Sequence, residues 1–161
     1  MILGVELREL TRHAMGERGY WFQEQGRFAD PFFVEGAAQW SRTKMQTGLV
    51  KAWHIHQKQV DWWSVESGLV KAVLCDMRHT PWPNLPVSQK LLDQCRPFEF
   101  YLGDDQPPAI LKIPPGVAHG LKVLQGPAVL SYLTSREYDP ADEGRIPFDA
   151  LGYDWLKQDI K

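Results

Sequence analysis

The stretch GLVKAWHIHQKQVDWWSVESG, residues 48–68, guides the interpretation of the rest of the chain. Its first part, residues 49–56, alternates between two sets of side chains: Val50, Ala52, His54 and His56, and Leu49, Lys51, Trp53 and Ile55. Such alternation predicts a half-buried β-strand. Because side chains two residues apart on a strand point the same way, we expect His54 and His56 to share one face, opposite Lys51.

The remaining sequence favours further strands. Ser67-Gly68 predicts a turn before an apolar run at 69–78, and later strands are expected near 98–103, 109–113, 117–124 and 128–138. Helix signals are weak, and the best of them covers residues 86–94. Many short strands separated by Gly and Pro turns predict an all-β sandwich or barrel with few short helices.

The length and composition suit one globular domain. A chain of 161 residues can bury a real core, and we expect N-terminal strands at about 1–35, a barrel at about 36–135 and a tail at 136–161. The net charge of -2 favours neither a nucleic-acid nor a membrane partner. Charges within MILGVELREL, where a signal peptide is apolar, favour a cytoplasmic protein.

The two cysteines show no metal-binding or CxxC spacing. Cys75 lies in the apolar run KAVLCDMR, and Cys95 follows 20 positions later. A reduced thiol packed in the core is the interpretation that this context favours over a nucleophile.

Polar residues with possible chemistry gather around the opening stretch. His54 and His56 precede Asp61, and His119 follows the rigid turn Pro114-Pro115-Gly116. Three imidazoles and one carboxylate can ligate Zn, Fe, Mn, Ni or Cu. From the residues alone, a metal site, a proton-transfer site and polar strand positions all stay open.

The chain resembles the cupin superfamily in two motifs. Residues 48–68 match Gly-x5-His-x-His-x(3-4)-Glu-x6-Gly with Asp61 in place of Glu, and PPGVAH (114–119) matches Pro-x-Gly-x2-His. The resemblance implies a double-stranded β-helix, or jelly-roll, barrel. It also implies an alternative function as a metal-dependent cupin with one divalent metal held by His54, His56, Asp61 and His119.

A second resemblance covers most of the chain. GERGYW, GLVKAWHIHQ, IPPGVAHG and SYLTSREYDPADEGRIPFD look, in this order, like motifs of the dTDP-4-dehydrorhamnose 3,5-epimerase family. The resemblance implies a homodimer that exchanges N-terminal strands and epimerises a nucleotide-linked 4-keto-6-deoxy sugar without a cofactor. A base removes a proton next to the ketone, and an acid returns one on the other face.

The epimerase resemblance also implies roles for individual residues. The base maps to His54, the acid to Tyr132, and a neighbour of the base to His119. The residues that map onto substrate-contacting positions are Arg18, Gln39, Lys51, His56 and Tyr138.

The chain departs from the family pattern at several of these positions. Asp61 stands where the family has an active-site lysine, and His56 where it has Gln. The family aspartate that orients the base has no direct match, which leaves Asp159 or Asp61 for that role. These departures keep the metal-dependent cupin open, and a non-catalytic sugar-binding cupin as a third hypothesis.

Overall fold

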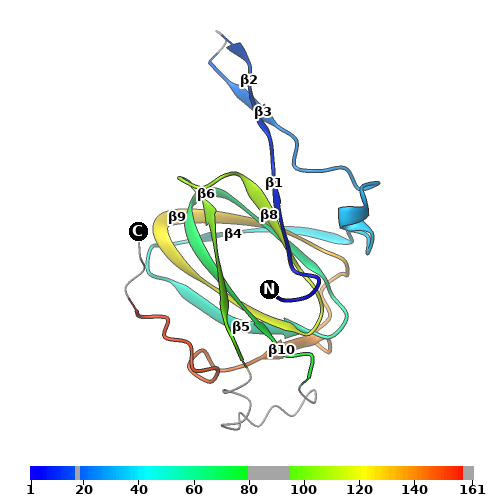
Figure 1. Ribbon diagram of the computed structural model, residues 1–161, viewed down its shortest axis with the longest axis vertical. Helices are drawn as coiled ribbons and strands as arrows, with labels where there is room; N and C mark the ends of the chain where they lie inside the picture. Colours follow the sequence, from blue (N-terminus) through cyan, green and yellow to red (C-terminus); the bar gives the residue numbers. More distant parts are fainter. Residues whose placement is uncertain (17–18, 80–94, 158–161) are drawn as a thin grey trace.

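The computed structural model describes residues 1–16, 19–79 and 95–157 (Figure 1). The strands are β1 (Glu6–Glu9), β2 (Arg12–Ala14), β3 (Trp21–Gln23), β4 (Gln39–Met45), β5 (Val50–His56), β6 (Asp61–Asp76), β7 (Phe98–Gly103), β8 (Ala109–Ile113), β9 (Val117–Thr134) and β10 (Glu143–Arg145). A short 3₁₀ helix, η2, spans Pro31–Phe33. The all-β prediction is confirmed. The helix expected at 86–94 lies outside the described residues.

Two long strands form the centre of the fold. β6 has 16 residues and β9 has 18, and they pair antiparallel from Asp61–Thr134 to Asp76–Val117. The predicted turn at Ser67-Gly68 is therefore wrong, because β6 continues through it with shifts of register between Val65 and Val70. A β-bulge absorbs the turn-forming residues by bending the strand instead of reversing it.

The bends let β6 and β9 each contribute to two facing layers. In the first layer, the half of β6 near Asp61 pairs with β8 and the half of β9 near Thr134 pairs with β4. β1 extends this layer by pairing with β8. The other halves of β6 and β9, near Asp76 and Val117, pair with β7 and β5, and β10 adds to β5. The core between the layers includes Trp63, Val70, Leu74, Leu111 and Leu121. This arrangement is a jelly-roll barrel.

The outer faces of both layers are covered by chain ends. Trp53, Ile55 and Val73 pack against Ile146, Leu151, Tyr153 and Trp155 of the tail. On the other layer, Trp62 and Ile110 pack against Phe32 and Phe33 from η2. The alternation expected for β5 is confirmed in its second half, since Trp53 and Ile55 face outward to the tail while His54 and His56 line the cavity. It is wrong in the first half, where Val50 and Ala52 pack on the same outer cluster as Trp53.

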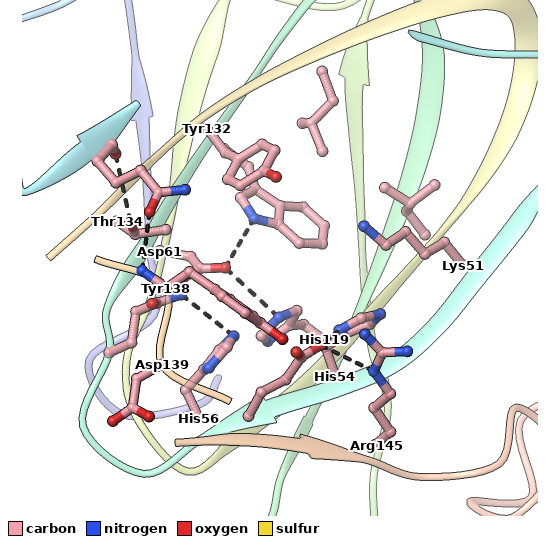
Figure 2. A pocket seen from close by; sticks show the side chains of 16 residues that line it. Lys51, His54, His56, Asp61, His119, Tyr132, Thr134, Tyr138, Asp139 and Arg145 are labelled. Carbon is pink, nitrogen blue, oxygen red and sulfur yellow. Dashed lines mark hydrogen bonds and ion pairs between the residues drawn. The ribbon is translucent and has the colours of Figure 1, made fainter. Parts of the chain in front are cut away.

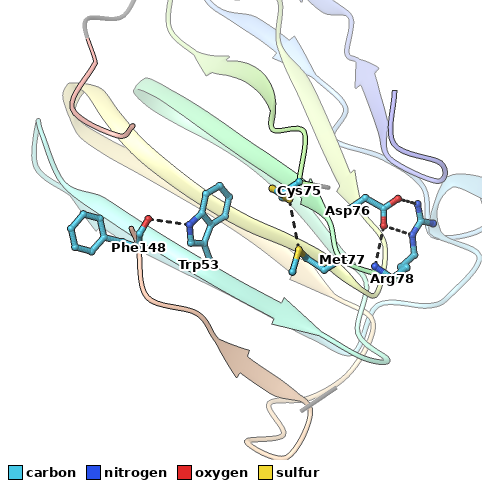
Figure 3. Close-up of a disulfide and its surroundings, with 7 residues drawn as sticks. Trp53, Cys75, Asp76, Met77, Arg78 and Phe148 are labelled. Atoms are coloured by element: carbon cyan, nitrogen blue, oxygen red, sulfur yellow. Dashed lines mark hydrogen bonds and ion pairs between the residues drawn. A yellow bond between two sulfur atoms is a disulfide. The ribbon is translucent and has the colours of Figure 1, made fainter. Parts of the chain in front are cut away.

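Cys75 and Cys95 form a disulfide (Figure 3). Their Cα atoms lie 5.7 Å apart, because the pairing of Leu74 with Phe98 brings the segment before β7 alongside the end of β6. The expected reduced core thiol is therefore wrong. Sequence spacing could not reveal this contact, which depends on the β6–β7 register.

The hairpin of β2 and β3 projects away from the barrel (Figure 1). Tyr20, Trp21 and Phe22 are about half exposed on it, at 49%, 54% and 54%. Among the described residues, no helix has the length and apolar character needed to cross a bilayer.

Candidate active site

A cavity of about 500 Å³ opens between the two layers. It is lined by the predicted site residues Gln39, Lys51, His54, His56, Asp61, His119, Tyr132 and Tyr138. Arg18 lies outside the described residues. Figure 2 shows the three imidazoles gathered at one end of the cavity, with Tyr132 above them. The volume is in the range of pockets that hold small organic ligands.

Strand register brings these side chains together from distant parts of the sequence. His54 of β5 lies opposite His119 of β9, and their rings stack with centroids 6.2 Å apart. Tyr132 lies near the other end of β9, where it pairs with Trp63 of β6. This pair belongs to the layer that faces the layer of His54. His54 and Tyr132 therefore approach the cavity from opposite layers.

Lys51 departs from the expected strand alternation. The pairing of β5 with β9 shifts register between Lys51 and His54, so both side chains line the cavity. The expectation that Lys51 faces away from the histidines is wrong, because a local irregularity of this kind interrupts the two-residue period.

His54 is held by a carboxylate that the sequence interpretation missed. Its Nδ1 lies 2.8 Å from Oε1 of Glu143, whose side chain is only 10% exposed. An ionised carboxylate only accepts hydrogen bonds, so Nδ1 carries the hydrogen and Nε2 keeps a lone pair. Burial lowers the pKa of His54, the charge of Lys51 lowers it further, and Glu143 partly opposes both. The neutral imidazole is thus favoured, as a base requires.

Glu143 reaches the site because it begins β10 directly after the turn at residues 140–142. Asp142 is buried, and its carboxylate accepts the backbone N–H groups of Gln57, Lys58 and Gln59 at 3.0–3.1 Å. β10 then pairs with β5, matching Glu143 to His56. EGRI could be read as a short strand, but nothing in the sequence identifies β5 as its partner.

Glu143 also binds Arg145. Nε of Arg145 donates to the same Oε1 at 3.1 Å, and the Arg145 side chain is 73% exposed at the cavity rim. Burial raises the pKa of Glu143, but hydrogen bonds and charges of Arg145 and His54 outweigh it and hold the pKa below its usual value. Glu143 is therefore an anion between two donors.

His119 and Asp61 form a second buried pair. Nδ1 of His119 donates to the carbonyl oxygen of Val117 at 3.1 Å, which leaves its Nε2 unprotonated 3.7 Å from Oδ2 of Asp61. Gln59 Nε2 and Trp63 Nε1 donate to the two Asp61 oxygens at 2.7 and 3.3 Å. Burial lowers the pKa of His119 to about 3 and raises the pKa of Asp61.

The donor set of His56, Asp61 and His119 fits a divalent metal. One ligand atom from each lies within 4.8 Å of the others, and His54 is not part of this group. Ligands about 2.0–2.2 Å from one zinc ion lie roughly 3.3–3.6 Å apart in a tetrahedron, so these donor atoms would have to move closer together to bind one ion. Nδ1 of His56 is buried without a hydrogen-bond partner in the described part of the chain.

Gln39 anchors the loop that carries Tyr138. Its Oε1 accepts the backbone N–H of Tyr138 at 2.9 Å, and its Nε2 donates to Ser41. The Tyr138 side chain, which is 65% exposed, extends over the cavity in Figure 2. An exposed ring at the rim can stack on a planar group of a bound ligand.

Comparisons with known proteins agree with this architecture. A family model described as dTDP-4-dehydrorhamnose 3,5-epimerase matches residues 4–161. The spore coat polysaccharide biosynthesis protein SpsL of Bacillus subtilis is 36% identical, covering 96% of this chain and 97% of SpsL.

Solved structures show the same fold. A dTDP sugar isomerase of Desulfovibrio desulfuricans G20 superposes with a TM-score of 0.80 at 21% identity, covering 98% of this chain and 94% of that one. The RmlC epimerase of Mycobacterium tuberculosis has a TM-score of 0.74 at 25% identity, covering 96% and 75%.

Proposed function

Because this chain belongs to the dTDP-4-dehydrorhamnose 3,5-epimerase family, a family of dTDP-sugar epimerases and isomerases, we propose that it moves protons beside the ketone of a dTDP-linked 4-keto-6-deoxy sugar. The observation that carries the proposal is the contact of His54 with Glu143 at 2.8 Å, in a cavity that Tyr132 enters from the opposite layer. A base and an acid on two faces of one ring suit inversion at carbon.

The reaction follows from ketone chemistry. Nε2 of His54 takes the proton from the carbon next to the carbonyl, and the electrons of the broken C–H bond form an enolate whose charge rests on the ketone oxygen. The Tyr132 hydroxyl then gives a proton to that carbon from the other side, and the carbonyl re-forms with inverted configuration. Solvent then takes the added proton from His54 and returns one to Tyr132.

Asp61 changes the electrostatics that the family lysine would supply. Burial raises the pKa of Asp61, and in its neutral form the carboxyl group does not repel the enolate. Lys51, which lines the same cavity, is a cation available to offset negative charge on the substrate. We therefore assign His54, Tyr132, His119 and Asp61 to the reacting centre, with no cofactor.

Deuterium exchange tests this assignment. The protein is incubated in D₂O with dTDP-4-keto-6-deoxyglucose, and label at C3 and C5 is followed by NMR. We expect His54→Asn to lose exchange by on the order of 100-fold or more, and Tyr132→Phe to keep part of the exchange while losing the inverted product. His79→Asn, which changes an exposed histidine outside the cavity, is the matched control. Wild-type exchange that persists in His54→Asn would overturn the proposal.

A second candidate is a metal-dependent enzyme, favoured by the group of His56, Asp61 and His119. These residues would hold one divalent ion, with His54 nearby. Such an ion supplies Lewis-acid stabilisation of a carbonyl oxygen. The chain's own contribution is to orient the ligands, as Gln59 does for Asp61 and Val117 for His119.

Elemental analysis of the protein as purified separates the two candidates. Stoichiometric transition metal that is lost in His56→Ala and kept in His79→Ala would replace the cofactor-free mechanism. Metal below a tenth of an equivalent in wild-type protein after incubation with zinc, iron, manganese or nickel, at about 10 µM each, would exclude the second candidate. Binding of dTDP without any exchange would instead support a sugar-binding protein.

We further propose a cytoplasmic homodimer in which the β2–β3 hairpin packs on a second copy of the chain. The exposed Trp21 and Phe22 on a projecting hairpin support this, since large apolar patches mark contact surfaces. Light scattering should show a dimer that Trp21→Ser with Phe22→Ser weakens. Because disulfides are uncommon in the cytosol, alkylation of Cys75 in intact cells tests the location. Modification of a free Cys75 thiol would support a cytoplasmic protein, and protection of Cys75 by the disulfide would contradict it.

A further inference from the structure

The short strand β10 places two charged residues beside the base. It is fixed on β5 by reciprocal hydrogen bonds between Trp53 and Ile146, both 3.1 Å, and by the buried carboxylate of Asp142. Glu143 and Arg145 thus stand on a strand pinned at both ends. Residues held in this way keep a defined geometry toward the cavity.

We propose that Glu143 is the positioning residue of His54, and that Arg145 fixes Glu143 and binds the diphosphate of the nucleotide sugar. The inference rests on the proposed function. It assigns to a residue of β10 the orienting role for which the sequence offers Asp159 or Asp61. Asp61 is engaged instead with Gln59, Trp63 and His119, and the cited contacts place no Asp61 atom on His54.

The geometry gives Glu143 a definite task. Its Oε1 accepts from Nδ1 of His54, so the lone pair of Nε2 is directed to the substrate carbon instead of to the protein. The proton taken from carbon goes to Nε2, while the proton on Nδ1 stays where it is. Glu143 therefore stabilises the imidazolium that forms and is not itself protonated.

Arg145 is placed to bind an anion at the cavity mouth. Only its Nε is used by Glu143 in the described contacts, which leaves both Nη groups for the two-pronged binding of a phosphate. Lys51 lines the same cavity and offers a single ammonium in place of a guanidinium. Asp139 and the Glu143 carboxylate line the same cavity, and the proposal requires the two cations to outweigh both acidic groups at the position of the diphosphate.

Three measurements on the full chain test the two roles separately. The first is the ¹⁵N spectrum of the histidine rings, which reports whether His54 carries its hydrogen on Nδ1. The second is the dissociation constant of dTDP. The third is the split between kcat and KM in the exchange or epimerisation assay with dTDP-4-keto-6-deoxyglucose.

For Glu143, we expect wild-type His54 in the Nδ1–H form and a shift toward Nε2–H in Glu143→Leu. Glu143→Gln keeps an accepting carbonyl without the charge, so its kcat should lie between those of wild type and Glu143→Leu, which falls on the order of 100-fold or more. The dTDP dissociation constant should change less than threefold in both. His54 in the Nε2–H form in wild-type protein would overturn this role.

For Arg145, we expect Arg145→Gln to weaken dTDP binding about tenfold and to raise KM alike, with Arg145→Lys in between. Arg42→Gln and Glu66→Gln remove an exposed ion pair of 2.5 Å outside the cavity, and as matched controls they should leave all three measurements unchanged. Unchanged dTDP affinity in Arg145→Gln would overturn the phosphate role.

The outcomes separate this inference from the proposed function. Absence of exchange in wild-type protein defeats the proposed reaction, but the ring spectrum and dTDP affinity still decide the roles of Glu143 and Arg145. Exchange that requires His54 and ignores Glu143→Leu, in protein shown to be folded, sustains the reaction and defeats the positioning role.

Discussion

His54 and Glu143, which lie 89 positions apart in the sequence, form a hydrogen bond in the cavity. The histidine itself could be selected from the sequence, because its spacing to His56 and the motif around it mark the position. Glu143 could not, since an acidic residue in a polar run is usually solvated. Its burial depends on Asp142, which is placed only when the turn at 57–59 and the tail come together.

Gly68 shows the same dependence on a contact. It has a φ of +77°, and a Cβ there would lie 2.6 Å from the carbonyl oxygen of Gln125 and 2.7 Å from Cα of Ala128. The glycine was expected in a turn. Its position is explained instead by the close approach of β6 and β9 at their bends.

We predict that Gly68→Ala lowers the free energy of unfolding by about 3 kcal/mol, through left-handed strain and overlap with β9. Gly48→Ala is the matched control, because Gly48 has a φ of +82° but no atom within 4 Å of the added Cβ. It should cost only about 1 kcal/mol. Urea unfolding measures both, and equal losses would show that the contact with β9 is unimportant.

At the scale of elements, the sequence predicts the positions of the strands better than the residues at which each strand begins and ends. The apolar runs at 98–103 and 109–113 became β7 and β8, since alternation and flanking turn residues agree there. The runs on either side of Ser67-Gly68 and of Gln125–Pro127 fused into β6 and β9, because pairing along the full length outweighs local turn preference. β10 was missed, as three residues are too few for a periodic signal.

β10 leads to a prediction at the scale of elements. We expect Asp142→Ala to destabilise the protein by about 2 kcal/mol, because three backbone N–H groups lose a charged acceptor. Hydrogen exchange at Gln57–Gln59 should quicken together with exchange in β10. Asp154→Ala, which removes an exposed acceptor of two N–H groups, should cost less than half as much. Equal effects would mean that β10 is held by other contacts.

In the whole molecule, ionised carboxylates attach the chain ends to the barrel. Asp76 binds Arg78, which donates to the carbonyl of Leu3, and Glu99 accepts from Lys157 and from Tyr153 at 2.6 Å. The bond from Arg78 lowers the pKa of Asp76. Burial raises that of Glu99, but bonds from Lys157, Tyr153 and Tyr101 outweigh it, so its pKa is lowered.

We therefore predict a loss of stability in acid. A carboxyl group with a lowered pKa binds its proton more readily in the unfolded chain, so its contribution is complete above the usual pKa of about 4 and is lost as pH falls below it. Each such group lowers the free energy of unfolding by at most about 1.4 kcal/mol for each pH unit of acidification, and by less where solvent screens the ion pair. Thermal unfolding between pH 6 and 3 measures the slope.

The double variant Asp76→Asn with Glu99→Gln provides the comparison. It should be less stable than wild type at pH 6 and should lose less stability on acidification. A slope equal to that of wild type would show that these ion pairs do not account for the acid sensitivity.

The sequence by itself determined the strand character, the shared face of His54 and His56, and the residues that resemble an epimerase, because these depend on local period and on motifs. Tertiary structure decided the fusion of strands into β6 and β9, the disulfide, the orientation of Lys51 into the cavity and the contact of Glu143 with His54. Each of these depends on register between segments far apart in the chain, and the free energy of such pairing has no counterpart in local composition.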